Sequence, residues 1–373
     1  MAVVAVGLVA GCSDLEALPG AAAEGGAGGA GGGSGGAGLA WAKPYSIQAF
    51  DETRIGSDPS QDSFHRVQTT IDLHDPPFHR VTLVVELGTT CYPFESWAEN
   101  PPPPGESWPA DCDAFDRNFE ISLEPPEGRS PPPALELVRA ITPFGGPMQI
   151  EQDITDLANA LPGRHTLQAH IATWSDGSGQ VTGSNGGWFV SARIDVVPGT
   201  SPRPVLAVVP LYYDSSGTAA GPGPLELTVP EGTFSGRIEY RATGHGGGPR
   251  GDGCIGPADE FCEREHAFWI DEGEVERQIL WRDDCDQLCT VSHYGPVGGG
   301  FDYCLENPCG ALSSVRAPRA NWCPGSVTAP LLIDSPALAE PGPHTFEWAL
   351  DEIGEGGSWR ISATYYAFGP PML

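Results

Sequence analysis

Two short motifs each occur twice in this chain, in the same order, and this internal repeat constrains the fold more than any other feature. The sequence PGRHTL at residues 162–167 returns as PGPHTF at 341–346, and GGWFVSA at 186–192 returns as GGSWRISA at 356–363. Each copy predicts a turn that opens a strand. We therefore predict two related β domains that both end in the same turn-strand-loop-strand hairpin, with the break at 198–204.

Composition and periodicity agree with a β fold. The 373 residues include 50 Gly and 38 Pro, which is typical of turn-rich β structure. Apolar residues alternate with others at Val81, Leu83, Val85 and Leu87, and again at Leu167, Ala169 and Ile171. The pattern predicts one short helix, opened by residues 153–157 with Asp or Thr as its cap and closed by Pro162 and Gly163.

The charge balance excludes two classes of partner. The chain contains only 19 Lys and Arg but 49 Asp and Glu, which gives a formal charge of −30. Nucleic acid and anionic lipid both attract basic surfaces, so we exclude nucleic acid as a partner and expect membrane contact only through a lipid anchor.

The N-terminus predicts that anchor. An apolar run ends in Val9-Ala10-Gly11-Cys12, which resembles the bacterial lipobox whose Cys12 becomes lipidated, although no Lys or Arg precedes the run. Gly, Ala and Ser then dominate residues 20–39, which predicts a flexible tether. We expect an exported protein, lipid-anchored to the bacterial cell envelope, at the outer membrane, or secreted.

Nine further cysteines favour an exported, disulfide-bonded protein, and because their number is odd, one thiol is left over or pairs between molecules. A zinc site is the rival interpretation, but the spacing lacks a paired Cys-x-x-Cys arrangement with matching histidines. We expect no metal and no cofactor.

Residues 112–117, Cys-Asp-Ala-Phe-Asp-Arg, place the carboxylate of Asp116 beside Arg117 at the start of a predicted strand. Phe119, Ile121 and Leu123 alternate with polar residues, so we expect a half-buried strand with a polar face. Cys112 can tie the strand start to Cys91. From these residues alone, a surface ion pair beside a structural disulfide is the simpler interpretation.

A second cluster lies in the other half of the chain, where Thr243-Gly244-His245 is followed by Cys254, Cys262 and His266. The two cysteines can close a small loop that orients Glu260, and an oriented carboxylate suits amide hydrolysis. The alternative is a glycine-rich surface loop with a disulfide.

Together these segments resemble the peptide-N-glycosidase F family of bacterial amidases, which release N-linked glycans from asparagine. The resembling stretches occur in the family's order from about residue 45 to the C-terminus. They are residues 112–117, 141–144, 153–156, 173–174, 207–210, 244–245, 260–262, His266 and 319–325.

The resemblance implies an all-β fold of two adjacent antiparallel eight-stranded jelly-roll sandwiches. We accordingly divide the chain into a lipoprotein signal region at 1–12, a Gly/Ala-rich linker at 13–44, an N-terminal jelly roll at 45–200 and a C-terminal jelly roll at 201–373. The resemblance also implies the disulfides Cys91–Cys112, Cys254–Cys262 and Cys285–Cys323, and places Cys289, Cys304 and Cys309 in an insertion.

The resemblance implies catalytic roles for Asp116, Glu260, Arg117 and Arg319. It implies substrate-binding roles for Asp113, Phe115, Trp174, His245, Phe261 and Trp322. The chain departs from the family where Ala172 replaces a second glutamate. Phe115 and Phe261 also stand where the family has Trp. Asp176 is the nearest acid that could replace the missing glutamate, but its Ser-Asp-Gly-Ser-Gly setting predicts a turn former.

The implied activity is metal-free hydrolysis of the asparagine-glycan amide bond in N-glycosylated proteins or peptides, by a monomeric enzyme. Asp116 is expected to activate water, Glu260 to position water or the first sugar, and the two arginines to hold Asp116 ionised and to stabilise the oxyanion. One alternative is a glycan- or protein-binding surface lipoprotein of the same fold. The other is a copper monooxygenase, which needs His and Met ligands that this chain, with three Met, hardly offers.

Overall fold

The computed structural model describes residues 42–125, 131–247, 253–296 and 298–372. The predicted signal region at 1–12, with Cys12, and the predicted linker up to residue 41 lie outside the described residues. Strands of the described part form four four-stranded antiparallel sheets and one two-stranded sheet. In the described part, no helix is long and apolar enough to cross a membrane.

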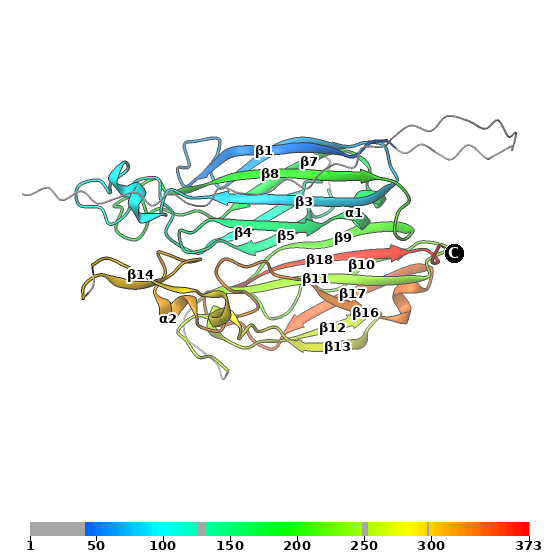
Figure 1. Ribbon diagram of the computed structural model, residues 1–373. Helices are drawn as coiled ribbons and strands as arrows, with labels where there is room; N and C mark the ends of the chain where they lie inside the picture. The colour runs from blue at the N-terminus through cyan, green and yellow to red at the C-terminus, as the bar shows by residue number, and fades with distance from the viewer. Residues whose placement is uncertain (1–41, 126–130, 248–252, 297, 373) are drawn as a thin grey trace, which may run out of the picture. The chain divides into compact units, whose positions relative to one another are not determined.

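The first half of the chain forms one β-sandwich (Figure 1). One sheet contains, in order, β1 (Tyr45–Gly56), β8 (Gly187–Pro198), β3 (Phe78–Gly88) and β6 (Met148–Asp153). The other contains β2 (Arg66–Leu73), β7 (Gly163–Ile171), β4 (Asn118–Leu123) and β5 (Leu135–Ile141). The two inner faces meet in one apolar core, to which both sheets contribute.

The second half repeats this arrangement. One sheet contains β9 (Val205–Ser216), β18 (Gly357–Phe368), β11 (Ser235–Gly246) and β16 (Leu331–Asp334). The other contains β10 (Leu225–Val229), β17 (Gly342–Leu350), β12 (Glu265–Ile270) and β13 (Gly273–Ile279). The strand order of each sheet matches its counterpart in the first half, so the eight-stranded antiparallel sandwiches that we expected are confirmed.

The repeated motifs open strands as predicted, but they do not form hairpins. Both copies of the first motif begin strands, β7 and β17, at their Pro-Gly turns. Both copies of the second motif begin β8 and β18. However, β7 and β8 lie in different sheets, as do β17 and β18. The chain therefore crosses between the layers of the sandwich, which lets each strand pair with sequence-distant neighbours.

The remaining regular elements are short. The predicted helix is α1 (Thr155–Ala160), but its N-cap is Ile154 rather than the expected Asp or Thr. Asp153, one residue earlier, accepts a hydrogen bond from the backbone N–H of Thr155 at 2.8 Å. The other α-helix among the described residues is α2 (Leu312–Val315). Four 3-10 helices accompany them: η1 (Phe94–Ala98), η2 (Asp259–Phe261), η3 (Cys285–Leu288) and η4 (Pro336–Ala339).

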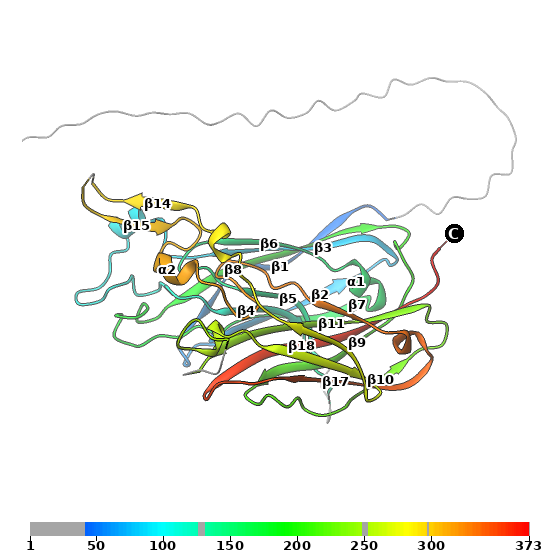
Figure 2. The same cartoon turned by 90° about the horizontal axis from the view of Figure 1, so that it is seen from below.

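An insertion adds a hairpin of β14 (Val291–Tyr294) and β15 (Phe301–Cys304), which lies near α2 at one end of the molecule (Figure 2). All three expected disulfides, Cys91–Cys112, Cys254–Cys262 and Cys285–Cys323, are present. A fourth joins Cys289 to Cys304 at the base of the hairpin. The leftover thiol is Cys309.

The expectation of a half-buried β4 is wrong, because the polar face of this strand is also buried. Glu120 is 2% exposed and Ser122 is 1% exposed. Glu120 accepts two hydrogen bonds from Arg360 of β18, at 2.7 and 2.8 Å, and a third from the Tyr213 hydroxyl of β9 at 2.5 Å. The polar face of β4 thus packs against the second sandwich, which alternation within one strand cannot reveal.

A second buried pair extends this contact. Arg139 of β5 bonds Glu136 at 2.7 Å and also donates to the backbone carbonyl of Arg360, while Ser362 donates to Glu136. Two arginines and two glutamates therefore balance their charges between the sandwiches. Burial alone raises the pKa of Glu120, but the hydrogen bonds and charge of Arg360, together with Arg139, lower it to about 2.

We predict that Arg360→Met destabilises the protein by about 3–5 kcal/mol, because it leaves the buried Glu120 without its bidentate partner. Denaturant unfolding at neutral pH measures the change. The matched control is Arg277→Met, since Arg277 makes ion pairs with Glu265 and Glu274 at the surface and their loss should change stability far less.

The same substitution has a pH signature. The pKa of Glu120 is lowered by folding, so the pair stabilises the protein fully above the unfolded value near 4.5, and this stabilisation is lost as the pH falls towards 2. The stability difference between wild type and Arg360→Met should therefore shrink in acid. A difference that stays constant from pH 7 to pH 3 would contradict the assignment.

Candidate active site

Three of the four expected catalytic residues come together where the loops of the two sandwiches meet. Asp116 lies two residues before β4 in the first sandwich. Glu260 lies in η2 and Arg319 in the loop between α2 and β16, both in the second half. The charges of Arg319 and Glu260 both act on the Asp116 carboxyl. The fold thus assembles this cluster from segments far apart in sequence.

Backbone hydrogen bonds across the two halves hold these loops in place. Gly325 donates to the carbonyl of Ile141 at 3.0 Å, and Ile141 donates to that of Ser326 at 3.0 Å. Thr142, directly after β5, ties down the residue beside Asp116: its N–H donates to the Arg117 carbonyl at 2.8 Å, and its hydroxyl accepts the Arg117 N–H at 2.9 Å. Thr142 belongs to the stretch 141–144 that resembles the family, although no role was predicted for it.

Arg319 is the buried cation of the cluster, at 1% exposed. It donates to Glu260 at 2.9 Å and to the carbonyl and hydroxyl oxygens of Ser314 at 2.9 and 3.0 Å. Its guanidinium lies 4.5 Å from the ring centroids of both Phe261 and Trp322. Its Nε–H is buried and has no hydrogen-bond partner among the described residues.

Glu260 is oriented by its own loop, as the sequence predicted. The Cys254–Cys262 disulfide closes this loop, and the Glu260 carbonyl accepts the Ala320 N–H at 2.8 Å. Next to it, Asp259 is buried and bonds Arg264 at 2.8 Å and the Trp359 indole at 2.9 Å. These bonds anchor η2 to the body of the second sandwich, and the Glu260 side chain remains partly exposed.

The electrostatics of the two carboxyls favour acid-base chemistry. Loss of surrounding water raises the pKa of Asp116 to about 7, and the nearby negative charge of Glu260 adds to the rise, while Arg319 and, more weakly, Arg117 oppose it. Burial also raises the pKa of Glu260 against the opposing effect of Arg319. The arginines therefore do not hold Asp116 fully ionised, contrary to our expectation.

Arg117 makes its ion pair with Asp113 rather than with Asp116. Its Nε lies 2.9 Å from Asp113, and its Nη2 also donates to the carbonyl of Trp174 at 3.2 Å. Asp113 is completely buried, so the expectation that it contacts substrate is wrong. The pair instead fixes the loop that carries Asp116 against the loop at 174.

The aromatic and histidine residues of the expected binding surface divide into two groups. Trp322 is 2% exposed and stacks on His245, whose pKa burial lowers to about 3, so His245 is neutral at physiological pH. Buried Trp322 supports the site and cannot itself form a binding surface. Phe115 and Phe261 are half-buried, and Trp174 is 49% exposed, so these three can contact a ligand.

The family's second glutamate position is occupied by Ala172, which lies close to the site. Its N–H donates to the Asn118 carbonyl at 3.1 Å, two residues beyond Asp116. Asp176 does not replace the missing carboxylate, because it accepts hydrogen bonds from Ser178 at 2.6 Å and from the backbone of Gly179 at 3.0 Å. It forms the turn that its sequence predicted.

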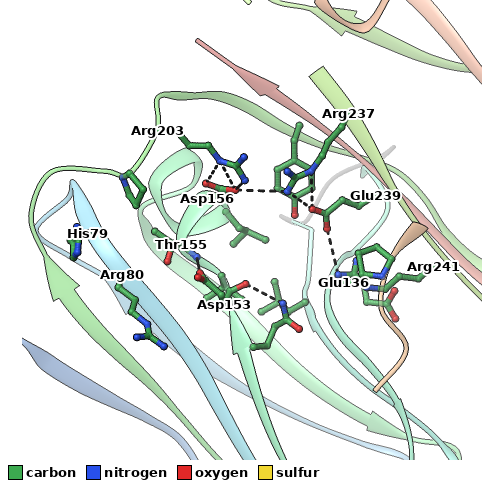
Figure 3. A pocket seen from close by; sticks show the side chains of 17 residues that line it. His79, Arg80, Glu136, Asp153, Thr155, Asp156, Arg203, Arg237, Glu239 and Arg241 are labelled. Atoms are coloured by element: carbon green, nitrogen blue, oxygen red, sulfur yellow. Dashed lines mark hydrogen bonds and ion pairs between the residues drawn. The ribbon is translucent and has the colours of Figure 1, made fainter. Parts of the chain in front are cut away.

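A cleft of about 760 Å³ lies elsewhere between the sandwiches, beside α1 (Figure 3). Three of its arginines are paired within the cleft: Arg203 bonds Asp156 at 2.9 Å, and Glu239 accepts Arg237 at 2.6 Å and Arg241 at 3.5 Å. Four arginines and four carboxylates line it, so they balance in charge. Because most of these groups are paired with one another, we do not place the active site there.

The fold and this cluster define a class of protein: a double jelly roll with an Asp-Glu-Arg site at the junction of its two sandwiches. Residues 213–365 match the family model described as peptide-N-glycosidase F, C terminal. No curated protein sequence matches the chain. The matched segment includes Glu260 and Arg319 of the candidate site.

Solved structures show the same fold. Recombinant peptide:N-glycanase F is 16% identical with a TM-score of 0.63, over 89% of this chain and 98% of that one. PNGase F, a glycosylasparaginase from Flavobacterium meningosepticum, is 18% identical with a TM-score of 0.63, over 88% and 96%. PNGF-II is 18% identical with a TM-score of 0.64, and this chain covers 66% of its length. These structures share the fold of this chain over most of its length, and the family model matches its C-terminal part.

The electrostatic coupling in this site can be measured directly. We predict that the Asp116 carboxyl titrates near pH 7, and that Glu260→Gln lowers its pKa because the substitution removes a neighbouring negative charge. Carbon-13 NMR of Asp-labelled protein, assigned with Asp116→Asn, provides the measurement. Asp176→Asn is the control and should leave the titration unchanged. An unchanged Asp116 midpoint in Glu260→Gln would show that the two carboxyls do not interact.

Proposed function

We propose that the protein is an amidase that hydrolyses the amide bond between asparagine and an N-linked glycan. The observation that carries this proposal is the meeting of Asp116, Glu260 and Arg319 at the junction of the sandwiches, with the pKa values of both carboxyls raised. The family relationship supports the same reaction. The substrate would be an N-glycosylated protein or peptide, acted on by a monomeric, exported enzyme tethered through Cys12.

In the proposed mechanism Asp116, as carboxylate, takes a proton from the water that attacks the carbonyl carbon of the asparagine side chain. A general base is most effective when its pKa lies near the working pH, and burial has raised that of Asp116 to about 7. The proton then passes to the leaving nitrogen as the C–N bond breaks. The products are a glycosylamine and a peptide that contains aspartate.

Glu260 and Arg319 would serve the transition state together. Their 2.9 Å hydrogen bond fixes both side chains, and the positive charge of Arg319 near Asp116 would stabilise developing oxyanion charge. Glu260, partly exposed, would accept a hydrogen bond from the water or from a hydroxyl of the first sugar. The chemistry assigned to these residues needs no metal ion or cofactor.

We predict that Asp116→Asn lowers glycan release by about 100-fold or more, because the amide has the shape of the carboxyl but no basicity. For wild type, kcat/KM should fall about tenfold per unit of pH below 7 as Asp116 becomes protonated. A fluorescent glycopeptide and chromatographic separation of the product provide the assay.

Stability separates loss of chemistry from loss of folding. Because the pKa of Asp116 is raised in the folded protein, the fold favours the protonated carboxyl. Its contribution to the free energy of unfolding is complete below the unfolded pKa near 3.8 and is lost as the pH rises through about 7. Asp116→Asn should thus be at least as stable as wild type at pH 8. Wild-type turnover by this variant would refute the mechanism.

Ala172 offers a test in the opposite direction. We predict that Ala172→Glu increases kcat/KM on glycopeptides about three- to tenfold, because the glutamate supplies a hydrogen-bond acceptor near the site. The backbone of Ala172 bonds that of Asn118, which lies two residues past Asp116. Asp176→Asn, in the neighbouring turn, is the matched control and should not alter turnover. If Asp176→Asn is damaging and Ala172→Glu has no effect, the site uses Asp176 and our account of this position is wrong.

A further inference from the structure

We propose that an aromatic cleft beside the candidate active site binds a neutral sugar residue in the outer part of the substrate's glycan. The cleft has a volume of about 650 Å³ and lies between η1 and the inserted β14–β15 hairpin. Its aromatic lining consists of Phe94, Trp97, Trp108, Tyr294, Phe301 and Tyr303. This inference rests on the proposed function, because it assigns part of the same substrate to a second surface.

The rings of the cleft are held by one another. Buried Phe94 makes edge-on contacts with Tyr294 at 5.0 Å and Phe301 at 5.7 Å between ring centroids, which joins the loop of η1 to the hairpin. Trp97 and Trp108 meet edge-on at 6.1 Å, and the Trp97 indole donates to the Cys91 carbonyl at 3.1 Å. The surface is therefore preformed, which reduces the entropy lost on binding.

Parts of this surface remain open to a ligand. Phe301 is 49% exposed and Tyr294 is 38% exposed, although large aromatic side chains are usually covered in a folded protein. A cluster of partly exposed rings in a concave setting is typical of a binding site. The Cys289–Cys304 disulfide staples the hairpin that supplies three of these rings.

The polar rim of the cleft indicates which ligand fits. Glu95, Ser107 and Asp302 line it, and none of the described lining residues is Lys or Arg. Carboxylates accept hydrogen bonds from hydroxyl groups and repel anions, and the whole chain carries a charge of −30. A sugar ring has one apolar C–H face for an aromatic ring and hydroxyls for the rim, so a neutral sugar fits better than an acidic one.

The cleft is connected to the catalytic cluster through packing. Cys309 lines the cleft and packs on the same two small apolar clusters as Phe115, the residue directly before Asp116. Phe115 in turn contacts Phe144 at 6.1 Å between ring centroids. A glycan whose first sugar lies at Asp116 and Glu260 can therefore extend past Phe115 towards the cleft.

The test uses two glycopeptides with the same peptide, one carrying an extended neutral oligomannose glycan and the other only the two innermost sugars. Phe301→Ala should raise KM for the extended substrate about tenfold, with kcat nearly unchanged, and should leave the short substrate unaffected. Tyr294→Ala should act in the same direction. Phe234→Ala, which removes a 63% exposed phenylalanine just before β11, is the matched control. Melting temperatures confirm that each variant is folded.

A direct titration separates this inference from the proposed function. Free neutral oligomannose should quench the fluorescence of Trp97 and Trp108 in the Asp116→Asn protein, and Phe301→Ala should weaken that binding about tenfold. If wild type releases no glycan but this titration behaves as described, the amidase proposal fails and the sugar site stands. Equal effects of Phe301→Ala on both glycopeptides, or unchanged binding of free oligomannose by this variant, would overturn the sugar site.

Discussion

The buried ion pair between Glu120 and Arg360 is the interaction on which the candidate site depends. It joins β4 of the first sandwich to β18 of the second, and the pair of Glu136 and Arg139 extends it. Such pairs contribute little net stability but penalise any other arrangement, since separating the sandwiches would leave four charges unpaired. Because Asp116 lies only two residues before β4, the register that this network selects also sets the position of Asp116 relative to Arg319.

The same constraint explains the electrostatics of the cluster. Asp116 and Glu260 belong to different sandwiches, and only their assembly places two carboxyls around one arginine. Arg319 bonds Glu260, and among the described residues Asp116 has no ion pair of its own to offset its loss of water. A carboxyl that is buried without an ion pair has a pKa suited to exchanging protons near neutral pH. Tight pairing elsewhere, as between Arg117 and Asp113, holds the loop rigid without ionising Asp116.

Local patterns predicted much of this arrangement, and the rest depended on contacts that no local pattern contains. Alternation located β3, β4 and β7, the repeat predicted two related halves, and family resemblance supplied three disulfides. The burial of Glu120 could not be predicted, because a strand with alternating polar residues normally exposes its polar face to solvent. The alternation does not reveal that a second sandwich covers this face. For the same reason Asp113 and Trp322 resembled binding residues, whereas the fold buries both.

The central claim is that water attacks the asparagine side-chain carbonyl with Asp116 as base. Hydrolysis of an N-glycopeptide in heavy-oxygen water, followed by mass spectrometry of both products, tests it most directly. The account predicts one heavy oxygen in the new aspartate carboxylate of the peptide, a freshly released glycosylamine without heavy oxygen, and neither product with Asp116→Asn. Heavy oxygen in the sugar with asparagine retained in the peptide would mean that a glycosidic bond is cleaved instead, and would contradict it.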